Sequence, residues 1–246
     1  MKKILKQKTA LALSAITLAL SVFSCKSVQF DMNTYSPIAV VTVFGNPALP
    51  WYDPQAKGSN AADDSLPGTL LKKANQENPE LYSVQDRIDS AYKTLVESLD
   101  EAGITLIDSS EFVNTDEYEK AAKTFLGSLE TDVPAKDLKI LDYMSGKRYQ
   151  SLANAIGAKG LMFVEFTFYK QKMPSGMHDI NILARSSMNV YIYDSTGKKV
   201  FHKKYTGLSG SGPLDDNGSY NKHDLIALYP ETVEYTVDCL VQDLLK

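Results

Sequence analysis

The sequence predicts an α/β fold: a mixed sheet of about five strands, packed with helices, in which a helix comes last. Two observations lead to this prediction. In the first half, short β-branched runs alternate with segments of helical period, which is the order of parallel strand–helix–strand units. Toward the C-terminus, three strand-like runs follow one another with only turns between them, which indicates an antiparallel three-strand meander.

The first half supplies the two parallel strands. Residues 38–44 (IAVVTVF) are a β-branched apolar run and are expected to form a buried strand. Apolar residues then recur at helical spacing over 84–102, between Ser83 as the N-cap and Gly103 as the stop. Residues 104–108 (ITLID) follow as the second strand. Because strand–helix–strand crossovers are right-handed and return the chain in the same direction, these two strands are expected to be parallel.

Helices are also predicted in the middle of the chain and at its end. Helical spacing runs over about 115–129, is broken at Pro134 and resumes over 135–158. The last helix carries Pro230 in its first turn, a position that tolerates proline because the N–H there has no partner within the helix.

The meander is predicted from three consecutive runs, at 161–170, 182–194 and 199–206. If the first turn is centred near Ser175, Glu165 on the first strand faces Arg185 on the second. Such a buried pair is more often structural than catalytic, and we interpret it as structural. A group of lysines on the third strand suits an edge strand, where lysines prevent unwanted pairing, or else a partner-binding patch: Lys198, Lys199, Lys203 and Lys204.

The N-terminus has the pattern of an export signal. Four lysines precede an apolar run over 9–23 that is too short to span a bilayer comfortably. The run ends in Val22-Phe23-Ser24-Cys25, which resembles a bacterial lipobox, where the chain is cut before a cysteine that then carries diacylglycerol and an acyl chain such as palmitate. We therefore predict a cleaved signal peptide at 1–24 and a lipidated Cys25. The alternative is an ordinary secretory signal with Cys25 incidental.

The predicted organisation after cleavage is simple. Residues 25–36 hold the lipidated cysteine and a short tether, and 37–246 form a single α/β domain with a long, proline-rich loop at 45–82. Lys26 follows the cysteine where enteric inner-membrane lipoproteins have Asp, so by that resemblance the protein is expected at the outer membrane, facing the periplasm. Two or more acyl chains would hold it there firmly.

Composition excludes some classes of partner. The whole chain has a formal charge of −4, and loss of residues 1–24 removes four lysines and no acids, which leaves 22 basic and 30 acidic residues and a charge of −8. Nucleic-acid binding needs a basic surface, so it is not expected. A hydrophobic content of 43% is that of a folded domain rather than of a disordered tail.

No catalytic or metal-binding signature is present. The three histidines lack the spacing of metal ligands on a helix, and no phosphate-binding loop or nucleophile elbow occurs: His178, His202 and His223. After lipidation of Cys25, only Cys239 remains, so no intramolecular disulfide is available, and Cys239 has no histidine near it in sequence. We predict that the protein is not an enzyme and that it binds no cofactor or metal.

Three aromatic residues are candidate partner-binding residues. Trp51 and Tyr52 lie in the long loop, where exposed aromatic residues often mark interaction sites, although the pair could equally pack the loop onto the core. Tyr235 falls away from the apolar stripe of the last helix, as does Cys239, so this side either is covered by a second layer or forms a contact surface.

Several stretches resemble a family of bacterial envelope lipoproteins. These stretches are the lipidated Cys25, IAVVTVF, SVQDRIDSAYKTLVESLDEAG with ITLID, and AIGAKGLMFVEFTF. They are similar in order and kind to the fold group of the TolB N-terminal domain, the curli secretion lipoprotein CsgG and the penicillin-binding-protein activator LpoB. The resemblance implies that fold over about 37–246 and, as a functional residue, only the lipid anchor. The chain lacks the long membrane hairpins of CsgG and the long disordered arm of LpoB.

These observations predict a lipid-anchored envelope protein that acts as a non-enzymatic binding or assembly module at the periplasmic face. Its partners would be the membrane, through the lipid, and an envelope protein or a second copy of itself. The alternative is a periplasmic lipoprotein that binds a small molecule or a metal, with the 45–82 loop as its lid.

Overall fold

The computed structural model confirms an α/β fold with a mixed sheet. It describes residues 31–54, 78–122, 132–141, 146–175, 179–216 and 218–246, and within these Asp31–Leu245 belong to one compact unit. The strand order is β2-β1-β4-β5-β6, with β3 also paired to β1. The predicted signal peptide and Cys25 lie outside the described residues, as does most of the 45–82 loop.

β1 (Ile38–Gly45) is the central parallel strand, as its β-branched sequence predicted. It pairs in parallel with β2 (Leu106–Ile107) on one side and with β4 (Gly160–Pro174) on the other. Its side chains are almost all buried, as expected for a strand that is covered on both faces. The second predicted strand, 104–108, is present, but only two of its residues pair in the sheet, as β2.

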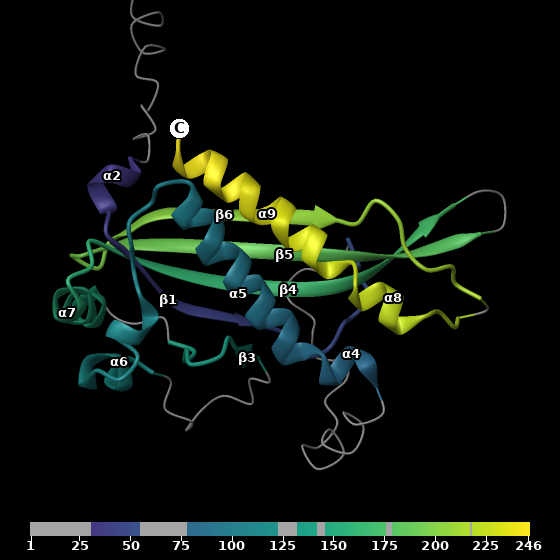
Figure 1. The fold of residues 1–246 in the computed structure, drawn as a ribbon, viewed down its shortest axis with the longest axis horizontal. Helices are drawn as coiled ribbons and strands as arrows, with labels where there is room; N and C mark the ends of the chain where they lie inside the picture. The colour runs from purple at the N-terminus through teal and green to yellow at the C-terminus, as the bar shows by residue number, and fades with distance from the viewer. Residues whose placement is uncertain (1–30, 55–77, 123–131, 142–145, 176–178, 217) are drawn as a thin grey trace, which may run out of the picture. The chain divides into compact units, whose positions relative to one another are not determined.

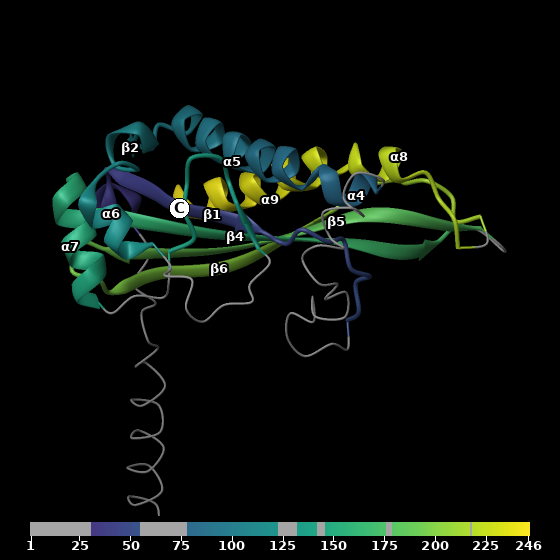
Figure 2. The same cartoon turned by 90° about the horizontal axis from the view of Figure 1, so that it is seen from below.

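Two long helices cover one face of the sheet (Figure 2). α5 (Val84–Glu101) and α9 (Tyr229–Leu244) lie side by side and run in the same direction (Figure 1). Both bury the apolar stripe that the sequence predicted: Ile88, Ala91, Leu95 and Leu99 from α5, and Val233, Val237, Leu240 and Leu244 from α9. Gly103 ends the α5 region in the left-handed conformation (φ 76°), which only glycine adopts without strain.

The meander is present, but the first hairpin has a different register from the one predicted. β4 and β5 (Ile180–Asp194) pair over their whole length, and β6 (Lys199–Leu208) follows as an edge strand. Glu165 lies opposite Asn189, and Arg185 lies opposite Tyr169. The expectation that Glu165 faces Arg185 was therefore wrong, because the strands extend further and their turn is centred two residues later than Ser175.

The middle of the chain corrects a second prediction. Residues 135–141, expected to be helical, form an irregular segment along β1 instead. The Ala135 N–H donates to the Val43 carbonyl at 2.8 Å, and Asp137 has a φ of 66°, which is incompatible with an α-helix. Ala135 thus pairs with the sheet, and the only backbone bond found within this segment closes a single turn, from the Leu138 N–H to the Ala135 carbonyl at 3.0 Å. β3 (Val133–Pro134), which precedes it, pairs with β1 in the antiparallel direction.

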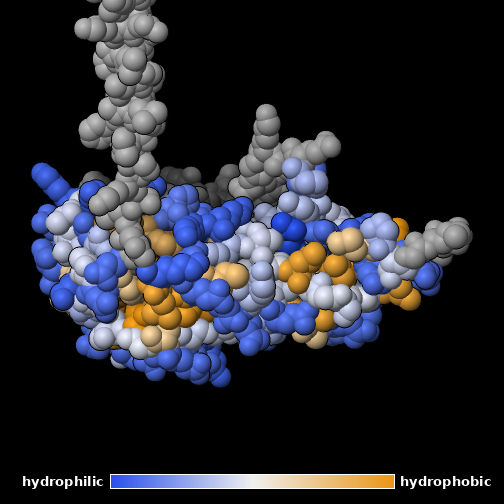
Figure 3. All heavy atoms as spheres, turned by 90° about the horizontal axis from the view of Figure 1, so that it is seen from above, coloured by the Kyte–Doolittle hydropathy of each residue, from blue (hydrophilic) through white to orange (hydrophobic). Residues whose placement is uncertain are grey.

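The shorter helices gather at the two ends of the sheet (Figure 1). α6 (Asp116–Ala121) and α7 (Gly146–Ile156) lie at the end where β1 begins, as does α2 (Met32–Tyr35). α4 (Pro79–Tyr82) and α8 (Lys222–Ile226) lie at the other end, and η2 (Ser109–Glu111) follows β2. From above, the surface is mostly hydrophilic, and hydrophobic residues form separate patches (Figure 3). No helix in the described part of the chain is long and apolar enough to cross a membrane.

Replacement of Gly207 by alanine is expected to destabilise the domain. α9 approaches β6 so closely that a Cβ at Gly207 would lie 2.2 Å from the carbonyl oxygen of Thr232, so the helix must move away from the sheet. Overpacking of this kind costs about 1–3 kcal/mol, which urea denaturation monitored by circular dichroism would measure. Gly210→Ala is the matched control, because a Cβ there meets no atom within 4 Å. Equal effects of the two changes would contradict the close approach.

Candidate functional site

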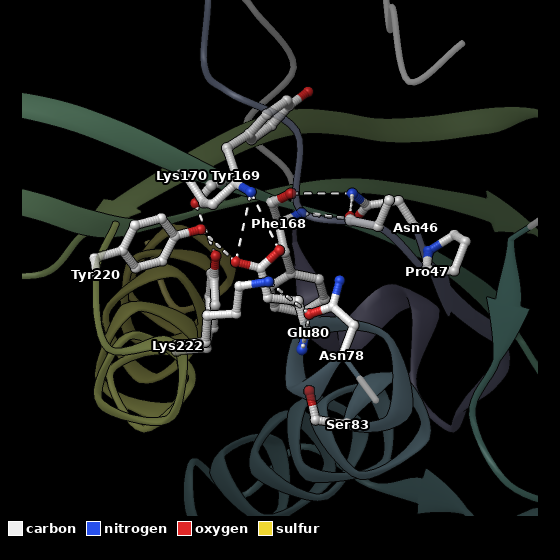
Figure 4. Close-up of polar contacts among 12 residues, drawn as sticks. Asn46, Pro47, Asn78, Glu80, Ser83, Phe168, Tyr169, Lys170, Tyr220 and Lys222 are labelled. Atoms are coloured by element: carbon white, nitrogen blue, oxygen red, sulfur yellow. Dashed lines mark hydrogen bonds and ion pairs between the residues drawn. The ribbon is translucent and has the colours of Figure 1, made fainter. Parts of the chain in front are cut away.

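The chain makes a sharp change of direction where it leaves β1, and the side chain of Asn46 holds it. The Oδ1 of Asn46 accepts from the Phe168 N–H at 2.8 Å, and its Nδ2 donates to the Phe168 carbonyl at 3.0 Å (Figure 4). Asn46 therefore takes the place of the next strand residue beside β4. Because its side chain satisfies the backbone of β4, the main chain is free to turn at Pro47.

The chain then returns to β4 for one more pairing. The Lys170 N–H donates to the Pro50 carbonyl at 2.9 Å, and the Tyr52 N–H donates to the Lys170 carbonyl at 2.7 Å. Trp51 is thus fixed as a short parallel extension of β1 along β4. Since neighbouring strand residues point to opposite faces, this pairing sends the side chains of Trp51 and Tyr52 to opposite sides of the sheet.

Trp51 is the exposed member of the pair. Its side chain lies on the face of the sheet that carries Lys170 and Lys172, whose ammonium nitrogens are 5.1 Å and 5.2 Å from the centre of the indole ring. The ring of Tyr220 meets it edge to face at 6.2 Å. Even with these neighbours, 45% of Trp51 remains exposed. We call these four residues, Trp51, Lys170, Lys172 and Tyr220, the Trp51 surface.

Tyr52 is packed onto the opposite face. The guanidinium carbon of Arg185 lies 3.8 Å from the centre of its ring, and Tyr169 contacts it edge to face at 5.8 Å. Arg185 also donates to the side chain of Gln171 at 2.9 Å. Burial raises the pKa of Tyr169 above its ordinary value. The sequence left open whether Trp51 and Tyr52 bind a partner or pack the loop onto the core. Tyr52 packs onto the domain, whereas Trp51 is exposed and available to a partner.

A buried carboxylate, Glu80, lies beneath the Trp51 surface. Its side chain accepts from the ammonium of Lys170 at 3.2 Å and from the hydroxyl of Tyr220 (Figure 4). The side chains of Glu80 and Lys170 are only 7% and 13% exposed. Burial and the neighbouring Glu80 carboxylate together raise the pKa of Tyr220 well above its ordinary value, so this phenol stays protonated and donates.

Asn78 places Glu80. As the N-cap of α4, it accepts from the Glu80 N–H at 3.3 Å through its Oδ1, and the same oxygen accepts from the ammonium of Lys222 at 3.1 Å. Lys222 is the first residue of α8 and Tyr220 lies just before this helix, so two short helices are joined here by side-chain bonds. The C-terminal end of the 45–82 segment is therefore attached to the sheet and to the last third of the molecule at one point.

Arg87 is the second buried cation of this region. It is 6% exposed, and its terminal nitrogens donate at 3.3–3.4 Å to four neutral oxygens: the carbonyls of Asn46, Pro47 and Glu80, and the hydroxyl of Ser83. Its guanidinium also lies over the rings of Phe168 and Tyr229. Burial lowers the pKa of Arg87 to about 10, and the nearby Glu80 charge offsets only part of this shift.

This arrangement supports the side chain of Trp51. The polar groups of Glu80, Lys170 and Tyr220 are directed at one another, and they fix the floor on which the indole lies. Trp51 was predicted from the sequence, whereas Glu80 was not, because the partners of Glu80 are 90 and 140 residues away along the chain. No spacing rule connects residues that meet only after the sheet has formed.

The other candidate residues lie elsewhere. Tyr235 is 59% exposed on the outward side of α9, and no contact in the described part of the chain joins it to Trp51. His202 stacks on Tyr191 and shares a hydrogen bond with Asn189 at 3.0 Å. Lys203 pairs with Asp243 of α9 at 2.8 Å. Within the described ranges, no group of three potential ligands could hold a metal ion.

Comparison with known proteins places the chain in no established family. No family model and no curated protein matches it. Among solved structures, it is weakly similar to the crystal structure of lipoprotein GNA1162 from Neisseria meningitidis, with a TM-score of 0.32 and 12% identity over 83% of this chain and 97% of that one. It is also weakly similar to the hypothetical protein CT253 from Chlamydia trachomatis, with a TM-score of 0.30 and 11% identity over 85% and 92%.

Replacement of Glu80 by glutamine is expected to destabilise the domain. The change keeps the shape of the side chain but leaves the buried cations Lys170 and Arg87 without a compensating charge. Loss of one partner of a buried pair costs about 3 kcal/mol, and the urea midpoint should fall accordingly. Glu97→Gln is the control, because Glu97 pairs with Lys93 on the exposed surface of α5 and should contribute less than about 0.5 kcal/mol. A small loss at Glu80, similar to that at Glu97, would refute the supporting role.

Proposed function

We propose that this protein is a lipid-anchored bacterial envelope protein that binds another protein through the Trp51 surface, without catalysis. The observation that carries the proposal is a half-exposed tryptophan held on a buried, charge-paired floor. Tryptophan is the residue type most enriched at the energetic centres of interfaces. An anchor whose backbone and neighbours are already ordered loses little conformational entropy on binding, which favours affinity.

The position of the Trp51 surface suits a membrane-anchored binding module. Five residues separate Cys25 from Asp31, and a chain segment of that length spans at most about 20 Å. The backbone of α2 is packed against Gly160 at the start of β4, whereas Trp51 is paired with Lys170. Ten residue steps along β4 separate Gly160 from Lys170, a length of about 33 Å. A lipid on Cys25 would therefore hold the α2 end near the membrane and leave the Trp51 surface away from it.

The charges around Trp51 indicate the kind of partner. Lys170 and Lys172 flank the indole, and Lys172 is half exposed although it pairs with Asp215 at 2.7 Å. Because each of the two lysines is paired with a carboxylate, the surface is close to neutral, which suits an apolar contact centred on the indole. We infer an envelope protein as the partner; self-association is the other outcome of the test below.

Crosslinking in intact cells, followed by mass spectrometry, tests the binding surface. One envelope protein should dominate the crosslinked material, and Trp51→Ala should reduce its recovery by about tenfold or more, since truncation removes the anchor. Tyr235→Ala is the matched variant, because it removes an aromatic ring of similar exposure from α9. Loss with Tyr235→Ala but not with Trp51→Ala would move the contact to α9. If crosslinks form only between copies of this chain, the surface serves self-association and does not bind an envelope protein.

Replacement of Cys25 by serine tests the anchor. The domain should fold normally, as judged by its urea midpoint, but should leave the membrane fraction, because no acyl chain then holds it to the bilayer. Membrane pelleting of the Cys25→Ser protein that resists salt extraction would overturn the lipid anchor. If the protein with Cys25 intact is recovered in the inner-membrane fraction and not in the outer-membrane fraction, the proposed location is wrong.

A further inference from the structure

A pocket lies between the first turns of α5 and α9. It has a volume of about 270 Å³, and buried residues from both helices form its floor: Ser83, Arg87, Ala91, Tyr229 and Val233. Asp86 and Ala227 are at its rim and are exposed. The pocket is separate from the Trp51 surface. Arg87 lines the pocket and also donates to the carbonyl of Glu80, whose side chain supports the Trp51 surface.

Two helix N-termini open into this pocket. α5 and α9 run in the same direction side by side, so their first turns meet at the same end (Figure 1). Neither helix has a side-chain cap: Ser83 and Leu228 are the N-cap residues, and neither makes a capping hydrogen bond through its side chain. Each N-terminus of a helix of this length carries a partial positive charge and uncapped N–H groups, fewer in α9 because Pro230 has no N–H, and these favour an anion.

Arg87 adds a buried positive charge at the floor, and the Glu80 charge compensates only part of it. The buried side chains here comprise two cations, Arg87 and Lys170, but one carboxylate, Glu80, which is paired with Lys170. The acceptors of Arg87 are all neutral, and its Nε–H has no acceptor. Two buried cations that share one carboxylate are incompletely compensated, so a negative charge bound beside Arg87 would stabilise the folded protein.

The lining indicates the rest of the ligand. Ala91, Val233 and the ring of Tyr229 are apolar, whereas the Ser83 hydroxyl accepts from Arg87 at 3.3 Å and keeps its own proton available for a ligand. We propose that this pocket binds a small carboxylate with a short aliphatic chain, its carboxylate toward Ser83 and Arg87 and its chain along Ala91 and Val233. This site goes beyond the proposed protein-binding function and does not depend on it.

Two acidic residues oppose the anion and make the proposal testable. Asp86 and Glu231 lie in the first turns of α5 and α9, and both are exposed. Asp86 is at the rim of the pocket, so its charge should weaken the binding of a carboxylate without preventing it. Removal of that charge should therefore strengthen binding, which a purely apolar pocket would not show.

Hexanoate is the probe, and its methyl ester is the neutral control. Titration of the mature protein, followed by chemical-shift changes in NMR spectra, should give a Kd of roughly 1 mM for hexanoate. Methyl hexanoate, which keeps the chain but lacks the charge, should bind at least about tenfold more weakly. Equal binding of the acid and the ester would overturn the anion site, and no binding of either would overturn the pocket as a ligand site.

Three variants locate the site. Asp86→Asn should strengthen hexanoate binding roughly two- to fivefold, whereas Glu97→Gln, the same charge change farther along α5, should leave it unchanged. Ala227→Trp should block the mouth and abolish binding, and because Ala227 is exposed, the urea midpoint should not change. Equal effects of Asp86→Asn and Glu97→Gln, or full binding by Ala227→Trp, would overturn the placement. Trp51→Ala should bind hexanoate normally, so the two proposed sites can fail independently.

Discussion

The buried carboxylate of Glu80 is the interaction on which the functional end of the molecule depends. It joins α4 to Lys170 on β4 and to Tyr220 before α8, three segments that are far apart in sequence. A buried carboxylate is unfavourable unless it is paired and hydrogen-bonded, and here it has both a cation and a phenol donor. The pairing therefore fixes how these segments meet, and with them the floor under Trp51.

The same buried network separates two surfaces of different chemistry. On the side of Lys170, an ordered, half-exposed tryptophan lies beside Lys172, which suits a protein partner. On the side of Arg87, an excess of buried positive charge faces a small pocket at two helix N-termini, which suits an anion. Because Arg87 contacts the Glu80 carbonyl directly, both surfaces share one support, although each can be changed by variants that leave the other intact.

Local patterns predicted most of the elements. The β-branched run of β1, the apolar stripe of α5 and the three runs of the meander were all found at nearly their observed bounds, because each is determined by side chains that are close in sequence. The errors have another origin. Residues 135–141 have helical spacing, yet Ala135 pairs with β1, and the register of the β4–β5 hairpin depended on how far both strands continue.

The sequence by itself determined the fold class and the presence of an aromatic pair at Trp51 and Tyr52, and it predicts a lipid anchor at Cys25. Only the tertiary structure decided which of the two is exposed, because one backbone pairing with Lys170 sends them to opposite faces. The pocket was likewise invisible in the sequence, since it exists only where the first turns of α5 and α9 meet. Sites of this kind arise from contacts between distant segments, and sequence spacing carries no record of such contacts.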